Sequence, residues 1–507
     1  MVRRLAGAHT RVPGVARRGN VFVVALALAV AVTGCGSREE AVIADPVAEA
    51  LAYAPADAAV LAVVATDTSA GLGAESARSG GAGLVRAQAQ AAFREGLDLD
   101  ADDVRPLLGR PLVIWSTDGS AGTRFAAWVV RDEERLGELL EARTGSRALS
   151  AAPGFGDFAL YRLRDGGAYG RRGPVIVSAP DLDSLRAALG RRQAGGEQWS
   201  PQLLRERGLG LPAGALARVM LDAQALVARR GGSAERIAWV AALERAAFTV
   251  TPEAGGVRVR ARASTDAEAL SPSDVPVAPG EEAPDTRGDG RIVLALRDPS
   301  QTLRFARSVV DLLDPSRLDG LRAAEMVLDR FGGVSVEEDF VGNLAGSATF
   351  TSDDGRELTL RADLENPKVT EDALRRLGKL GRLGGPLANL AGIDVGGIGV
   401  EERDGVTVIT QGGTPLLAAA VMDGALVAST NPDADLLAAA GAPAEPPEAQ
   451  AGALRATVDE QFVEGVLTGL GLPALTDSAL VLDGPLVVTA RGEWDRFDVE
   501  LVLPIAG

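Results

Sequence analysis

Two stretches of this sequence decide how the chain is organised. Residues 99–119 read LDADDVRPLLGRPLVIWSTDG, and residues 335–355 read SVEEDFVGNLAGSATFTSDDG. They align without a gap, and both end in Asp-Gly, which between two strand-like runs is a strong signal for a β-hairpin. This correspondence between the two halves of the chain predicts an internal duplication.

The correspondence extends in both directions from these stretches. Each half opens with a strand and a helix, and the hairpin strands run into a second helix, for which Thr370 is the expected N-cap in the second half. The order β-α-β-β-α-β-β-α-β-α-β-β occurs twice. We therefore expect an α+β fold, built as a tandem duplication of a mainly antiparallel unit of sheet plus helices. The further matching segments are 173–185 with 424–436, 214–224 with 452–461, and the closing strand pairs 247–263 and 480–503.

A proline-rich and charged segment without apolar periodicity separates the two halves. This composition is typical of an exposed connector. We accordingly place repeat 1 at residues 49–264, a linker at 265–287 and repeat 2 at 288–507.

The first 34 residues have the features of an export signal. They contain five Arg and no acidic residue, followed by twelve apolar residues at 21–32. A spanning helix needs about 20, so this run fits the apolar region of a signal peptide. The sequence Val32-Thr33-Gly34-Cys35 resembles the lipobox of bacterial lipoproteins. The resemblance implies cleavage between Gly34 and Cys35, and a lipid anchor on Cys35 that includes fatty acyl chains such as palmitate. Residues 35–48 would then be the lipidated Cys and its tether; the alternative is a small buried Cys near a cleavage site.

The charge of the mature chain bears on its partners. Removal of the five Arg leaves 47 basic and 69 acidic residues, a net charge of 47 − 69 = −22. Such a chain lacks the basic face that nucleic acid requires, and anionic headgroups repel it. We therefore expect no nucleic-acid partner. Attachment to the membrane would come from the lipid on Cys35, which makes the expected location extracytoplasmic and lipid-anchored to the cell membrane.

Two residue types are almost missing, and their absence limits the chemistry. His9 is the only histidine and lies in the signal, and Cys35 is the only cysteine. The mature chain therefore lacks the groups for Ser-His-Asp or Cys-His catalysis, zinc ligation by His or Cys, and disulfides. The two lysines, Lys368 and Lys379, lie in no recognisable motif and are expected on the solvated surface. We expect no cofactor, no resident metal and no enzymatic activity.

A second resemblance involves two motifs of the first half. Tyr53-Ala-Pro-Ala-Asp-Ala-Ala-Val60 and the segment 97–109, LDLDADDVRPLLG, are similar to a family of bacterial secreted proteins and lipoproteins of unknown function. In that family a P-A-D element leads into a strand, and a D-x-x-P-W-L-G-like element precedes the next hairpin. Here Leu107 replaces the usual aromatic residue, and the second half keeps only Asp339, Leu344 and Gly346. The resemblance implies no particular activity.

Acidic residues recur at places where they could either form a functional site or cap a helix. Asp98-Leu-Asp-Ala-Asp-Asp103 has alternate carboxylates suited to calcium, but it lacks the Gly and Glu of an EF-hand loop, so we favour helix capping. Two further pairs follow a strand in each half, Asp181 with Asp183 and Asp433 with Asp435. Such pairs can perform acid–base catalysis. Since both also begin helices, capping is again the preferred interpretation.

Aromatic and apolar residues offer two further candidates. Trp115 and Trp128 flank one hairpin and could stack on a sugar, although core packing is the simpler interpretation. Leucines recur at helical spacing from Leu374 to Leu390, interrupted by Gly378, Gly381, Gly384 and Gly385. This segment is either a mobile flap over an apolar ligand or, as we favour, an amphipathic helix broken at glycine.

These observations lead to two functional hypotheses. The first is a non-enzymatic cell-envelope lipoprotein that binds or scaffolds, with a lipid or other apolar molecule as the ligand to test. The alternative is a carboxylate-dependent hydrolase acting on envelope glycans. A surface that binds only an envelope protein cannot be distinguished from the first hypothesis by sequence.

Overall fold

The computed structural model describes residues 45–66, 107, 109–120, 123–146, 148–164, 166–212, 214–253, 256–280, 282–284, 290–390, 398–432, 436, 452–463 and 483–504. By their contacts these residues form two compact units. The first comprises the described residues up to Leu203 and Gly214–Val219, and the second comprises Leu204–Ala213, Met220–Val463 and Leu482–Gly507. Each unit is considered separately below.

The first unit is a mainly antiparallel sheet with helices. Its pairings run in the order β4-β5-β6-β7-β3-β2-β1-β8. Its strands are β1 (Val60–Val64), β2 (Leu112–Ser116), β3 (Arg124–Val129), β4 (Leu149–Phe155), β5 (Phe158–Leu163), β6 (Ala168–Arg172), β7 (Val175–Ala179) and β8 (Ala217–Asp222). Its helices are α2 (Pro46–Leu51), α5 (Glu133–Gly145), α6 (Leu182–Gln193) and α7 (Pro201–Glu206).

Helices α5 and α6 lie on opposite faces of this sheet. Successive residues of a strand point to opposite faces, and on β6 the Arg171 side chain approaches Gly137 of α5. A Cβ placed on the next residue back, Gly170, would instead meet Leu189 of α6. Strands β1 and β2 are buried along their whole length, as expected of a sheet covered on both faces.

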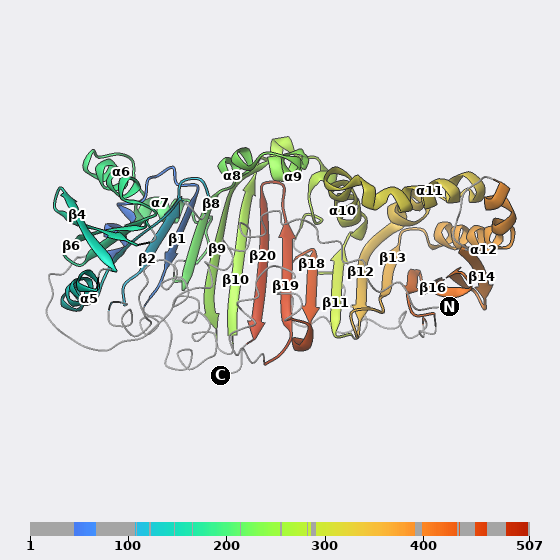
Figure 1. Ribbon diagram of the computed structural model, residues 1–507. Coiled ribbons are helices and arrows are strands. Elements are labelled where there is room, and N and C mark those ends of the chain that lie inside the picture. Colours follow the sequence, from blue (N-terminus) through green and yellow to red (C-terminus); the bar gives the residue numbers. More distant parts are fainter. Residues whose placement is uncertain are drawn as a thin grey trace, which may run out of the picture. The chain divides into compact units, whose positions relative to one another are not determined.

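The second unit has twelve strands among its described residues, and their pairings are antiparallel. The pairings run β9-β10-β20-β19-β18-β11-β12-β13-β17-β16-β15-β14, and Figure 1 shows β9 to β13 of this series side by side. The strands are β9 (Leu243–Glu253), β10 (Gly256–Thr265), β11 (Ile292–Arg297), β12 (Leu344–Ser352), β13 (Thr359–Leu364), β14 (Ile398–Arg403), β15 (Val406–Gln411), β16 (Thr414–Met422), β17 (Ala425–Ser429), β18 (Leu454–Val458), β19 (Leu486–Gly492) and β20 (Arg496–Pro504). The main helices are α8 (Ala223–Arg230), α9 (Ala238–Ala241), α10 (Pro299–Leu313), α11 (Asp319–Gly332) and α12 (Pro367–Leu390).

The predicted α+β class with mainly antiparallel sheets is confirmed. The pairings of β1 to β8 also match those of β11 to β18 one by one: β1 pairs with β2 and β8, and β11 pairs with β12 and β18. The two predicted hairpin turns have the same hydrogen bond, since Gly119 N–H donates to Ser116 Oγ at 2.9 Å and Gly355 N–H to Ser352 Oγ at 2.9 Å. Both glycines have positive φ, 76° and 72°, which a side chain would disfavour.

The number of strands was predicted incorrectly. Four strands, β4 to β7, lie between α5 and α6 where the sequence suggested two, and β14 to β17 occupy the equivalent place. The extra hairpin β4–β5 contains Pro153, Gly154 and Gly156, and most residues of β4 are exposed or half-buried. A strand without a buried alternating face leaves little periodic signal.

Two predictions about helix α12 were also wrong. The helix begins at Pro367, so Thr370 lies inside its first turn, fully buried, rather than at its N-cap. The helix also continues through the glycines to Leu390 instead of breaking at them. Each Gly costs a helix only about 1 kcal/mol. Leu374 and Leu377, which precede the glycines, pack in a buried cluster with Leu364 and Leu426 and hold this part of the helix on the sheet.

The segment between the predicted repeats is packed in part, although residues 271–273 are exposed as expected. Val275, Val277 and Ala278 are at most 3% exposed, and Val277 and Ala278 pack in a buried cluster with Ala453. Strands β9 and β10 fall in the second unit because β10 pairs with β20 over nine residue pairs. The sequence-based boundaries of the two repeats remain a prediction. Among the described helices, none is both long and apolar enough to cross a membrane.

Candidate functional site

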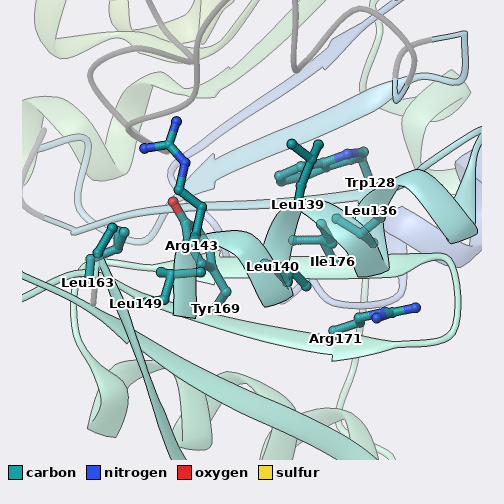
Figure 2. Close-up of a pocket in the computed structure, with 11 residues that line it drawn as sticks. Trp128, Leu136, Leu139, Leu140, Arg143, Leu149, Leu163, Tyr169, Arg171 and Ile176 are labelled. Atoms are coloured by element: carbon teal, nitrogen blue, oxygen red, sulfur yellow. The ribbon is translucent and has the colours of Figure 1, made fainter. Parts of the chain in front are cut away.

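An apolar cavity lies between α5 and the sheet of the first unit (Figure 2). Its volume is about 30 Å³, which is room for one or two water molecules. Eight of its eleven lining residues are apolar: Trp128, Leu136, Leu139, Leu140, Ala148, Leu149, Leu163 and Ile176, with Tyr169, Arg143 and Arg171 completing the wall. The chemistry of the wall suits an aliphatic group.

The local sequence explains how α5 covers this cavity. Asp132 is the N-cap, and its carboxylate accepts a hydrogen bond from the Arg135 N–H at 2.8 Å. Leu136 and Leu139, three residues apart, are the two residues of the helix that are buried against the sheet. The helix is thus held to the sheet through a narrow apolar contact.

Two arginines border the apolar cavity. Figure 2 shows the guanidinium groups of Arg143 and Arg171 apart from one another, with Leu140 drawn between them. Arg171 Nη2 lies 3.6 Å from the Glu133 carboxylate, and its Nε donates to the Gly173 carbonyl at 3.2 Å. Cationic groups at the rim of an apolar cavity can bind the anionic end of an amphiphile.

A polar cluster occupies the opposite face of the same sheet. The Glu49 carboxylate accepts hydrogen bonds from Arg172 Nη2 at 2.7 Å and from Arg192 Nη2 at 3.0 Å. The Tyr53 hydroxyl donates to Glu49 at 3.2 Å and accepts from Arg172 at 3.0 Å. Burial, together with the nearby Glu49 carboxylate, raises the pKa of the Tyr53 phenol far above its usual range, although Arg192 and Arg172 oppose the shift. The phenol therefore remains protonated and can donate.

A polar pocket of about 280 Å³ lies beside this cluster. A short antiparallel bridge between Pro55 and Gln198 holds its two sides together, and Ala56 N–H donates to the Glu197 carbonyl at 3.1 Å. Among the lining residues are Tyr53 and Asp57 on one side and Arg191, Arg192, Glu197 and Gln198 on the other. The volume is close to the lower end of the roughly 300–1,000 Å³ range of ligand pockets.

Comparison with known proteins identifies no family. No family model matches this chain, and no curated protein matches it. The solved structure entitled "Structure of crystal form III of TP0453" is similar at a TM-score of 0.28 and 9% identity, covering 45% of this chain and 81% of that one. Crystal form I of the same protein gives a TM-score of 0.28 and 9% identity, over 42% and 78%. At this TM-score the similarity assigns neither fold nor function.

Of the carboxylate pairs suggested by sequence, the structure describes Asp181 and Asp183, and only Asp181 acts as a cap. Asp181 is the N-cap of α6, and its carboxylate accepts from the Ser184 N–H at 2.8 Å. This bond and the one from the Ser184 hydroxyl lower the pKa of Asp181. Asp183 has 95% of its side chain exposed, so the pair forms no enclosed site. Asp433, Asp435 and residues 98–103 lie outside the described residues, as do Gly34 and Cys35. In the described part of the chain no group of three or more acidic, His or Cys side chains is placed to hold a metal ion.

The tryptophans and lysines follow the simpler interpretations. Trp115 is 1% exposed and stacks on Phe125, with ring centres 5.5 Å apart. Trp128 is 3% exposed and lines the apolar cavity, and neither ring is available to a sugar in solvent. Lys368 and Lys379 are exposed as predicted.

The polar cluster was missed by sequence analysis. Glu49 lies 123 positions from Arg172 and 143 from Arg192, so no local spacing connects them. Of the residues in the cluster, only Tyr53 belongs to a motif found in the sequence, the stretch that contains the P-A-D element.

Proposed function

We propose that this chain is a lipoprotein of the bacterial cell envelope, anchored outside the cytoplasm through Cys35, that binds a ligand and does not catalyse a reaction. The signal-like first 34 residues and the lipobox-like Val32-Thr33-Gly34-Cys35 support the anchor. The net charge of the mature chain supports a lipid, rather than surface charge, as the means of attachment.

The ligand that we propose is an apolar molecule with an anionic end, bound beneath α5. The observation that carries this proposal is the wall of the cavity, eight apolar residues bordered by Arg143 and Arg171. At about 30 Å³ the cavity admits an acyl chain only when α5 moves outward. The helix rests on the sheet through two buried leucines, so this movement breaks few contacts.

We also propose that the two halves arose by tandem duplication. The matching order of strand pairings and the two equivalent Ser-Gly turn bonds support this proposal. The hydrolase alternative has less support, because the described carboxylate pair that it invoked, Asp181 and Asp183, consists of a helix cap and an exposed side chain.

The anchor is tested by labelling cells with a fatty acid analogue. The full-length chain should carry the label and sediment with membranes, and the Cys35→Ala variant should do neither. Label on the variant would contradict lipidation at Cys35.

The ligand is tested by native mass spectrometry of residues 36–507, exported without the lipidation Cys. We expect an additional mass that organic extraction removes. Ala148→Val, which fills the cavity, should reduce the bound fraction at least about fivefold, while Ala151→Val on the exposed surface of β4 should not. An apo mass from the unmodified sequence would refute the apolar ligand, and equal loss in both variants would refute the site.

A further inference from the structure

We propose that the polar pocket bordered by Tyr53, Asp57, Arg191 and Glu197 is a second ligand site, which takes a neutral polyhydroxylated molecule such as a sugar ring. It lies on the opposite face of the sheet from the apolar cavity. The proposal therefore does not depend on the lipid anchor or on the apolar ligand.

The first argument is that the wall carries hydrogen-bonding groups without a partner in the described part of the protein, of which Asp57, Arg191 and Glu197 are exposed to solvent. Within the described residues, no hydrogen bond or ion pair engages the side chains of Asp57, Arg191, Glu197 or Gln198. Arg192, on the same wall, has a buried Nη1 without a hydrogen-bond partner, although its Nη2 binds Glu49. This Nη1 is closed off from solvent, so it does not itself face the pocket.

The second argument is the mixture of donors and acceptors. Arg191 and Arg192 supply donors, Asp57 and Glu197 supply acceptors, and Gln198 supplies both. The formal charges of these residues cancel. An anion would meet the two carboxylates, and a cation would meet the two guanidinium groups. A hydroxyl group both donates and accepts, so a ligand with several hydroxyls fits this wall without an uncompensated charge.

The third argument is that the donor side of the pocket is held in place before any ligand arrives. The Arg192 guanidinium carbon lies 3.9 Å from the Tyr53 ring centre, and its Nη2 is 2.9 Å from Glu49. Turn bonds from Gly195 N–H to the Arg192 carbonyl and from Gly196 N–H to the Arg191 carbonyl, both 3.2 Å, fix the chain after α6. Such preorganisation reduces the entropy that a ligand must lose on binding.

The test is saturation-transfer NMR of residues 36–507, which contain every described residue. The probes are glucose, mannose and N-acetylglucosamine, with acetate and glycine, which also carry C–H protons, as charged comparisons. We expect saturation of the ring protons of at least one sugar and of neither charged probe. Asp57→Ala should weaken the binding about tenfold, as expected for loss of a hydrogen bond to a charged group.

A pocket-filling variant ties the binding to this site. A Cβ on Gly196 would lie 3.5 Å from the Arg191 carbonyl, an ordinary contact, so Gly196→Leu should fold and block the pocket. Gly145→Leu, where a Cβ meets nothing within 4 Å, is the matched control outside the pocket. Loss of the sugar signal in Gly196→Leu alone supports the proposal. It is overturned if no sugar binds, if both variants bind equally, or if acetate or glycine binds in place of the sugars.

Discussion

The guanidinium group of Arg192 stacks on the ring of Tyr53 at 3.9 Å while its Nη2 pairs with Glu49 at 2.9 Å. The same ring meets Phe158 edge-on at 6.0 Å. Tyr53 therefore joins α2, α6 and the β5–β6 part of the sheet through one side chain, with an apolar face and a polar tip.

The polar tip of Tyr53 gives a direct prediction. Tyr53→Phe keeps the ring but removes the hydroxyl that bonds Glu49 and Arg172, and it should lower the free energy of unfolding by about 1–2 kcal/mol. The midpoint of urea unfolding, followed by circular dichroism, measures this change. Tyr161→Phe is the matched control, because the Tyr161 hydroxyl has no hydrogen bond among the described residues. Equal effects of the two variants would contradict the role of the cluster.

A second prediction involves Asp498 on β20. Its carboxylate pairs with Arg262 on β10, with Arg491 on β19 at 3.1 Å and with Arg496 at 3.4 Å. Asp498→Ala leaves these partly buried arginines facing one another and should cost about 2–4 kcal/mol. Thermal unfolding should show a lower Tm, whereas the exposed Asp495→Ala should unfold within about 0.5 kcal/mol of the unmodified chain. If the Tm of Asp498→Ala equals that of the unmodified chain, these ion pairs contribute nothing to stability.

A third prediction concerns acid stability at the first hairpin turn. Although desolvation opposes it, hydrogen bonds from Thr123 and Ser120 hold the pKa of Asp118 at about 2. A carboxyl group whose pKa is lowered on folding stabilises the folded state at every pH above its ordinary pKa near 4. This stabilisation is lost as the pH falls towards 2. Because Asp118 is exposed, we expect less than about 1 kcal/mol.

Asp118→Asn measures this contribution. Its deficit in urea-unfolding free energy should be present at pH 6 and should shrink between pH 4 and pH 2. Asp353→Asn, at an exposed residue of the equivalent turn in the second half, serves as the control. A deficit that does not change with pH would show that the carboxylate charge is not the stabilising feature.

A fourth prediction distinguishes the buried Thr370 from an N-cap. Its hydroxyl donates to the Asp339 carbonyl at 2.8 Å and accepts from Asn343 Nδ2 at 2.8 Å. Thr370→Val should cost about 1–3 kcal/mol, and Thr370→Asn, which an N-cap position would tolerate, should also destabilise the fold. Thr414→Val, at an exposed position on β16, should have little effect on the urea midpoint. If Thr370→Asn is as stable as the unmodified chain, the prediction that the buried Thr370 hydroxyl stabilises the fold is wrong.

Local signals in the sequence predicted much of the fold. The two Asp-Gly turns, the α+β class and the helix after the opening strand of the second half, α10, follow from patterns of a few neighbouring residues. The hairpin β4–β5 and the continuity of α12 did not. The hairpin lacks a buried alternating face on β4, and in α12 the glycines are too weak as breakers to end the helix.

By itself, the sequence determined the α+β class, the two Asp-Gly turns, the excess of negative charge and the near absence of His and Cys, because composition and turn chemistry are properties of adjacent residues. Only the tertiary structure decided which side chains meet. Arg171 and Arg172 are neighbours on β6, yet Arg171 borders the apolar cavity and Arg172 pairs with Glu49 on the other face. The physical reason is the pleat of the strand, which sends successive side chains to opposite faces. The helix that packs on each face then determines whether an apolar cavity or a polar cluster forms there.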